Sequence, residues 1–148
     1  MREILASEIT KAVEKLSIDA SYYLTEDVLC GLKKAAVTEE SPLGKEIIET
    51  IVENAVLAKE NDVPICQDTG MAVIFVKLGQ DVHIIGGDIY QAINAGVASG
   101  YTKGYLRKSV VNDPFIRENT KDNTPAVIHY SIVPGENIKL TVAPKGFG

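Results

Sequence analysis

The residues best suited to chemistry gather in one short segment, PICQDTG, at positions 64–70. Cys66 offers a soft sulfur ligand, and Asp68 offers a carboxylate that can accept a proton. A nearby negative charge disfavours the thiolate form, so an activated nucleophile would require a neighbouring cation, whereas a bound metal holds the sulfur as thiolate. The segment could therefore provide metal ligation at Cys66 and proton transfer at Asp68. From chemistry alone, the alternatives are a packed core thiol and a turn aspartate.

Three helices are expected before this segment. Apolar residues recur at intervals of three and four in Arg2–Leu16 and again in Thr25–Val37, where Thr25 is a plausible N-cap. A third helix begins with Ser41 as N-cap and continues past Lys59. Helical periodicity stops before Pro64, so residues 1–62 are predicted to be helical and residues 63–148 to mix strands with helix.

Strand-like runs follow the segment, with turn residues between them. In chain order we expect strands at 71–78 and 82–85, a helix from 89 to about 101, a long loop at 106–121, and strands at 126–133 and 137–142. Short turns link the strands of each pair, which predicts two hairpins. The sequence therefore predicts a single domain of the α+β class, with N-terminal helices followed by a mainly antiparallel sheet of hairpins and an intervening helix.

Composition restricts the class of protein. The 148 residues include 15 Lys+Arg against 20 Asp+Glu, for a net charge of -5, and 45% are hydrophobic. Such a chain can bury roughly two-thirds of its unfolded surface, and its acidic balance argues against nucleic-acid binding. No apolar run is long enough for a membrane span, and no signal peptide is evident, so we expect a cytoplasmic protein.

Two further features suit a small dicarboxylic acid. The guanidinium of Arg107 can donate a two-pronged hydrogen bond to a carboxylate. The sequence PKGFG at 144–148 is a glycine-rich turn whose backbone N–H groups an anion can approach closely. Because no element follows this turn, we expect the chain to be the front part of a longer polypeptide. Gln67 could bind substrate or brace its loop, and Thr69 is expected to brace.

Four motifs together resemble a known family. They are CQDTG at 66–70, LRKSVV at 106–111 followed by Asp113-Pro114, NTKDNTPA at 119–126, and PKGFG at 144–148. In this order they resemble the class I, iron-sulfur fumarate hydratases and the related L(+)-tartrate dehydratase alpha subunits. The resemblance covers the chain from about residue 60 to its end.

The resemblance implies roles for individual residues. Cys66 matches the first of three cysteines that hold a [4Fe-4S] cluster, whose fourth iron acts on the substrate as a Lewis acid. Asp68 matches a residue that transfers a proton or orients the group that does so. The remaining matches imply substrate binding by Gln67, Arg107, Lys145, Gly146 and Gly148.

The chain departs from the family pattern in its cysteines. The only other cysteine, Cys30, lies in a predicted helix outside any ligand motif, and His83 and His129 are expected to be ordinary strand residues. With two cysteines, this chain alone cannot supply the three cysteine ligands of such a site. The resemblance implies the N-terminal part of an alpha subunit that needs a beta subunit or C-terminal half and forms a homo- or hetero-oligomer.

The resulting interpretation is a hydro-lyase subunit that hydrates fumarate reversibly to L-malate and is inactive alone. Three alternatives stay open. The first is an L(+)-tartrate dehydratase alpha subunit, which shares the same motifs. The second is a noncatalytic assembly module. The third is a thiol redox protein using Cys30 and Cys66, although the chain has no Cys-x-x-Cys pair.

Overall fold

The computed structural model describes residues 1–147, which form two compact units. One unit combines Met1–Ser21 with Cys66–Gly148, and the other is Tyr22–Ile65. The N-terminal segment therefore folds with the second half of the chain, and the residues between them build a unit of their own. Each unit is described separately below.

The larger unit begins with a short strand, β1 (Arg2–Leu5), followed by helix α1 (Ala6–Tyr22). The prediction of a helix starting at Arg2 was wrong for these first residues. β1 pairs in parallel with β3 (Val82–Ile85), so that Arg2 lies opposite Val82. The apolar spacing in so short a stretch fits either element, and a partner strand that is distant in sequence decides between them.

The central sheet has the strand order β4-β2-β5. β2 (Met71–Gly79) pairs in parallel with β4 (Val127–Val133) and antiparallel with β5 (Ile138–Lys145). Both predicted hairpins are therefore wrong as pairings, although every predicted strand is present and the α+β class is confirmed. β2 takes the central position because it carries the most completely buried side chains of the sheet, Ala72, Ile74 and Val76.

The connection from β4 to β5 passes across the end of β2 instead of forming a hairpin. The Gly79 amide donates to the Asn137 carbonyl at 2.9 Å, and the Gln80 amide donates to the Val133 carbonyl at 2.9 Å. A side chain at Gly79 would place its Cβ 2.3 Å from the Gly135 carbonyl oxygen. Only glycine allows this close crossing.

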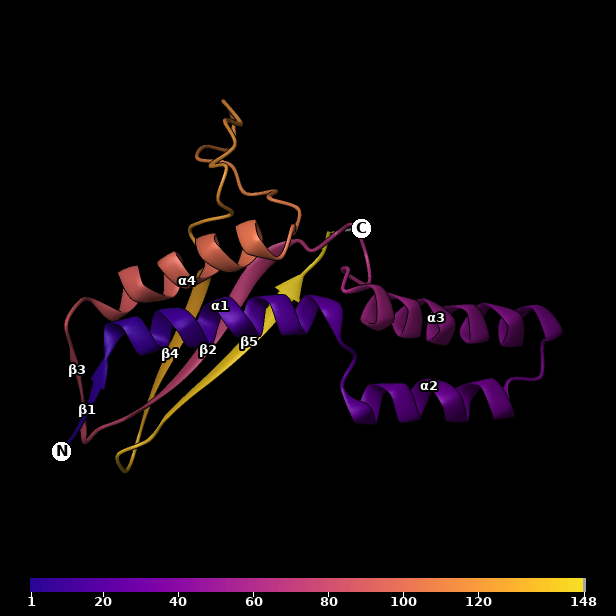
Figure 1. The fold of residues 1–148 in the computed structure, drawn as a ribbon, viewed down its shortest axis with the longest axis horizontal. Coiled ribbons are helices and arrows are strands. Elements are labelled where there is room, and N and C mark those ends of the chain that lie inside the picture. Colours follow the sequence, from indigo (N-terminus) through magenta and orange to yellow (C-terminus); the bar gives the residue numbers. More distant parts are fainter. Residues whose placement is uncertain (148) are drawn as a thin grey trace. The chain divides into compact units, whose positions relative to one another are not determined.

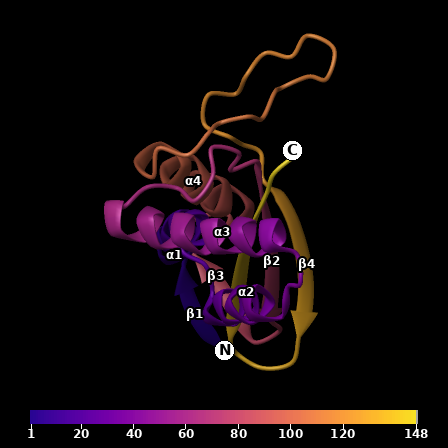
Figure 2. The ribbon, with the colours of Figure 1, turned by 90° about the vertical axis from the view of Figure 1, so that its right-hand side faces the viewer.

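Helices α1 and α4 (Ile89–Lys103) cover one face of the central sheet (Figures 1 and 2). The prediction of a helix over 89–101 is confirmed, and Asp88 caps it by accepting the Gln91 amide at 2.8 Å. The two helices approach closely at Gly96, where a Cβ would lie 2.6 Å from the Thr10 carbonyl oxygen. The core lies between helices and sheet, and its fully buried members include Ile9, Val13, Ile74, Ile93 and Val97.

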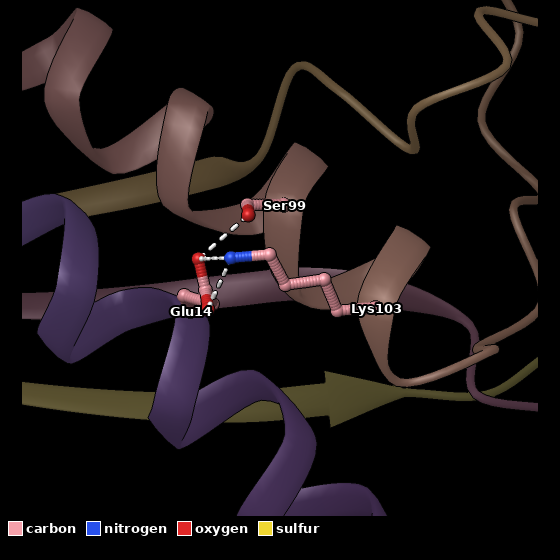
Figure 3. Close-up of polar contacts among 3 residues, drawn as sticks. All are labelled: Glu14, Ser99 and Lys103. Atoms are coloured by element: carbon pink, nitrogen blue, oxygen red, sulfur yellow. Dashed lines mark hydrogen bonds and ion pairs between the residues drawn. The ribbon is translucent and has the colours of Figure 1, made fainter.

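A polar contact joins the same two helices at the margin of this core (Figure 3). The Glu14 carboxylate accepts a hydrogen bond from the Ser99 hydroxyl at 2.6 Å and from the Lys103 ammonium at 2.9 Å. These two donors lower the pKa of Glu14. The contact adds a directional polar link between α1 and α4 beside their apolar packing.

The smaller unit is a pair of helices, α2 (Glu26–Thr38) and α3 (Pro42–Asn61), as predicted. The Ser41 hydroxyl caps α3 by accepting the Gly44 amide at 3.3 Å. Thr25 precedes α2 in an extended conformation, but its side chain makes no capping hydrogen bond. Among residues 1–147, no helix is both long enough and apolar enough to cross a membrane.

The segment between α4 and β4 is the long loop that the sequence predicted, and it extends away from the sheet (Figure 2). An antiparallel bridge between Val111 and Asn119 closes its outer part. At its tip the Asp113 carboxylate accepts the amides of Phe115 and Ile116, each at 2.8 Å. These contacts order the loop without a helix or a strand.

Candidate active site at the end of the central sheet

Two of the predicted site segments meet where β2 begins and β5 ends. Met71 lies opposite Lys145 in the antiparallel ladder, so residues 66–70 come to lie beside residues 145–147. Gly70 has a positive φ of 58°, and a Cβ on it would lie 1.7 Å from the Lys145 carbonyl oxygen. Glycine is therefore required here both for its backbone conformation and for the space.

The Asp68 carboxylate joins the two segments directly. Its Oδ2 accepts the backbone amide of Phe147 at 3.0 Å. A Cβ built on Gly146 would lie 3.0 Å from the same oxygen, so the carboxylate rests against the backbone of the glycine-rich segment. The structure thus brings Asp68 together with Gly146, two of the residues that sequence reasoning proposed for the site.

Cys66 lies beside Asp68 and is exposed. Its sulfur accepts the Asp68 amide at 3.4 Å, and its thiol donates to Gln67 Oε1 at 3.5 Å. The alternative of a packed core thiol is wrong, because the side chain faces solvent. An exposed sulfur that accepts a backbone N–H suits a thiolate ligand, since hydrogen bonds to sulfur stabilise its negative charge.

Arg107 is connected to the same place through its backbone. The Thr69 hydroxyl donates to the Arg107 carbonyl at 3.2 Å, and Thr69 itself is buried. The bracing role predicted for Thr69 is confirmed. The Arg107 side chain is exposed, so its guanidinium is open to a ligand from solvent.

The Lys145 ammonium lies 4.2 Å from the centre of the Phe147 ring and donates to the Gly146 carbonyl at 3.4 Å. A cation over an aromatic face is held by the electrostatics of the ring, which keeps this charge at the end of β5. Gly148 was also predicted to bind substrate, but it lies outside the described residues.

Two buried residues that sequence reasoning missed hold these segments together. The Tyr101 hydroxyl donates to the Thr69 carbonyl at 3.0 Å, and burial raises the pKa of Tyr101 to about 12. The Asn123 side-chain amide donates to the Gly70 carbonyl at 3.0 Å. Asn123 lies within the NTKDNTPA motif, so its position was noted but not its role. Only the contacts reveal that role.

The donor set for a metal is incomplete within residues 1–147, where no group of three or more His, Cys, Asp or Glu side chains could hold an ion. Cys30 is exposed and belongs to the smaller unit. His129 stacks on Phe75 with the ring centres 5.1 Å apart, and His83 is exposed. The described residues therefore fit one ligand position of an iron-sulfur cluster at Cys66 and not a whole site.

Comparison with known proteins identifies relatives over most of the chain. The sequence is 34% identical over 149 residues to a Methanocaldococcus jannaschii protein named "Putative L(+)-tartrate dehydratase subunit alpha", covering 95% of this chain and 51% of that relative. It is 31% identical to fumarate hydratase 2 of Leishmania major, covering 88% of this chain and 23% of that relative. It is 35% identical to the anaerobic class I fumarate hydratase of Escherichia coli, covering 74% and 20%.

The chain thus spans about half the length of the first of these relatives and about a fifth to a quarter of the other two. The family described as fumarate hydratase (Fumerase) matches residues 10–148, which include all the candidate site residues. The chain belongs to the fumarate hydratase (Fumerase) family.

Proposed function

We propose that this chain is part of a hydro-lyase that adds water reversibly to fumarate to give L-malate, and that it works within a larger assembly. One observation carries the proposal: the Asp68 carboxylate accepts the Phe147 amide and thereby joins the CQDTG segment to the glycine-rich segment. These are two of the motifs through which the sequence resembles the family. Membership in that family supports the class of reaction.

The proposed substrate is a small dicarboxylate, which needs cationic and N–H donors. Arg107 offers a guanidinium to one carboxylate, and the Lys145 ammonium and the backbone around Gly146 offer further donors. Gln67, exposed beside Cys66, can donate through its amide. Together these groups would orient the substrate over Asp68.

Dehydration of malate removes a proton from one carbon and a hydroxide from its neighbour. Asp68 is the proposed group for the proton, either by accepting it or by orienting the group that does. The backbone amide of Phe147 donates to Oδ2 of this carboxylate at 3.0 Å. This contact fixes the direction of the carboxylate.

The proposed cofactor is a [4Fe-4S] cluster with Cys66 as one of its three cysteine ligands. When bound, such a cluster supplies a Lewis acid that stabilises negative charge on the departing hydroxyl. The other ligands would come from the part of the relatives' length that this chain does not span. The same reasoning proposes a beta subunit or C-terminal half as partner, in a homo- or hetero-oligomer, and relatives named as alpha subunits support it.

A second candidate is dehydration of L(+)-tartrate. It is favoured by two relatives that are named L(+)-tartrate dehydratase alpha subunits and that this chain covers to about half their length. Tartrate differs from malate by one added hydroxyl. A site built to hydrogen-bond that hydroxyl rejects the substrate that lacks it.

The test is to assay the complete enzyme, assembled and kept without oxygen, on fumarate, malate and tartrate. Turnover of malate and fumarate supports the first proposal, whereas turnover of tartrate without malate supports the second. In either case Cys66→Ala should abolish turnover, and Asp68→Asn should reduce it by at least about 100-fold. A noncatalytic module would show no turnover and no cluster absorption in the wild-type protein.

A further inference from the structure

Asn123 is a fully buried polar residue in the loop between α4 and β4. Its side-chain Oδ1 accepts the amides of Ser109 at 2.7 Å and Val110 at 3.1 Å. Its Nδ2 donates to the Gly70 carbonyl at 3.0 Å. These contacts use both acceptor sites of the side-chain oxygen and one donor of the side-chain nitrogen.

The backbone of Asn123 is as specialised as its side chain. Its φ is 65°, in the left-handed region that asparagine tolerates better than most residues. The next residue, Thr124, is held by the Asp122 carboxylate, which accepts the Thr124 amide at 3.0 Å and its hydroxyl at 2.7 Å. The loop therefore holds the side-chain amide of Asn123 in a fixed direction toward the interior.

The partners of Asn123 lie beside the proposed site residues. Gly70 follows Asp68 by two positions in the chain, and Ser109 follows Arg107 by two. The Thr69 hydroxyl joins the same two segments directly by donating to the Arg107 carbonyl at 3.2 Å, and Asn123 adds a second link from a third part of the chain. Resting on the proposed function, we propose that Asn123 is a positioning residue that sets the spacing between the Arg107 segment and the Cys66–Gly70 segment.

Two substitutions at Asn123 distinguish the contacts of its oxygen with the Ser109 and Val110 amides from the contact of its nitrogen with the Gly70 carbonyl. Asn123→Asp is nearly isosteric and keeps the acceptor for the Ser109 and Val110 amides, but its second oxygen would face the Gly70 carbonyl without a proton. Asn123→Gly keeps the left-handed backbone and removes all the side-chain contacts. Glu14→Ala is the matched control, because it destabilises the same unit at the α1–α4 contact without touching either segment.

The first measurement is amide hydrogen exchange on the 148-residue chain. Asn123→Gly should speed exchange of the Ser109 and Val110 amides at least about tenfold relative to the wild type. Asn123→Asp should leave these two amides slow. Equal acceleration in Asn123→Gly and Glu14→Ala would overturn the proposal, since it would report general loosening of the unit.

The second measurement is a double-mutant cycle for kcat/KM in the complete enzyme. Misplacing a binding group by about 1 Å can cost about 100-fold, so we expect Asn123→Gly to lower kcat/KM by roughly that factor. In an Arg107→Lys background the same change should cost much less, because both act on the same substrate contact. Glu14→Ala and Arg107→Lys should instead combine additively within about twofold.

The outcomes keep the two proposals apart. If the wild-type enzyme turns over none of the three acids, the proposed function fails, while hydrogen exchange still tests the link through Asn123. If the wild type is active but Asn123→Gly and Asn123→Asp leave kcat/KM unchanged, or combine additively with Arg107→Lys, the positioning role is wrong. If Asn123→Gly does not fold, the isosteric Asn123→Asp variant carries the cycle.

Discussion

The α1–α4 contact and the end of the central sheet belong to the same compact unit but are held together differently. At the first, glycines let two helices approach, apolar side chains fill the space, and one carboxylate spans the margin. At the second, irregular loops are held by buried polar side chains that bond to backbone groups. Non-directional burial holds one region, and directional hydrogen bonds hold the other.

This difference has a consequence for function. Apolar contacts have no preferred direction. A buried amide or hydroxyl that loses its hydrogen-bond partner, by contrast, destabilises the fold by its full desolvation free energy. The end of the sheet is therefore the more rigidly specified region, although it contains the less regular backbone. Such rigidity suits groups that must meet a substrate at fixed distances.

The largest effect is expected for the group proposed to handle the proton. Asp68→Asn should lower kcat of the complete enzyme by about 100-fold to 10,000-fold, because an amide cannot accept a proton while its oxygen can still accept the Phe147 amide. Steady-state kinetics and urea unfolding measure rate and stability separately. Asp88→Asn is the control, since asparagine caps a helix as well as aspartate does. A variant with normal kcat would remove Asp68 from the chemistry.

Adding a methyl group to one glycine in each region tests how much extra side-chain volume that region accepts. Gly70→Ala should lower the free energy of unfolding by about 3 kcal/mol or more, because its Cβ would overlap backbone and its φ is positive. Gly96→Ala should cost about 1 to 3 kcal/mol, since only part of its crowding is against backbone.

Urea unfolding measures both variants, and Gly31→Ala serves as the control because a Cβ there meets nothing within 4 Å. That control should be neutral or more stable by up to about 1 kcal/mol, as expected for alanine in a helix. Equal losses at Gly70 and Gly96 would contradict the distinction between the two regions.

The buried tyrosine at the end of the sheet should make stability depend on alkaline pH. Both states keep the Tyr101 proton below about pH 10, but the unfolded state releases it first as pH rises toward the folded pKa of about 12. Stability should therefore fall by about 2 to 3 kcal/mol across that window, in addition to the effect of other groups.

Urea unfolding at several alkaline pH values measures this loss, with Tyr101→Phe as the reference that cannot ionise. The loss attributable to Tyr101 is the difference between the two slopes. Identical slopes would mean that Tyr101 titrates normally, and so that its hydroxyl is open to water.

The smallest effect is expected at the margin of the helix contact. Glu14→Gln should lower stability by about 1 kcal/mol at neutral pH, because its partners Ser99 and Lys103 stabilise the charged form. Since the folded pKa of Glu14 is lowered, this contribution is present at neutral pH and disappears as pH falls through that pKa.

Thermal or urea unfolding at neutral and acidic pH measures the change. Lys15→Gln is the control at a surface ion pair with Asp19, where Lys15 is 74% exposed and a loss below about 0.5 kcal/mol is expected. A pH-independent loss in Glu14→Gln would point to packing instead of charge.

The sequence predicted element positions well wherever a local signal exists. Ser41 and Asp88 cap the helices that follow them, and the strand-like runs at β2 and β4 place both strands within a residue or two. The pairing of the strands was predicted wrongly, because the short turns at Gly79–Asp81 and Pro134–Glu136 fit a hairpin as readily as a crossing. The choice between them depends on burial of β2 between two partners, which involves residues far apart in the chain.

The residues of the candidate site also differ in whether the sequence alone could predict them. Its outward residues, such as Cys66, Asp68 and Arg107, were identified from their types and from a resemblance, and the structure gathers the segments that carry them. Asn123 and Tyr101 were missed as contributors, because a buried amide or hydroxyl has no sequence signature apart from its partners. Those partners become neighbours only in the folded chain.

The sequence by itself determined the helices, every strand except β1, the class of fold and the chemical character of the exposed groups, since these depend on side-chain type and short-range spacing. The tertiary structure decided which strand lies at the centre of the sheet and which buried polar groups hold the loops at its end. The central strand and the buried polar groups both depend on contacts that exclude water between residues far apart in sequence. Short-range spacing in the sequence does not predict such contacts.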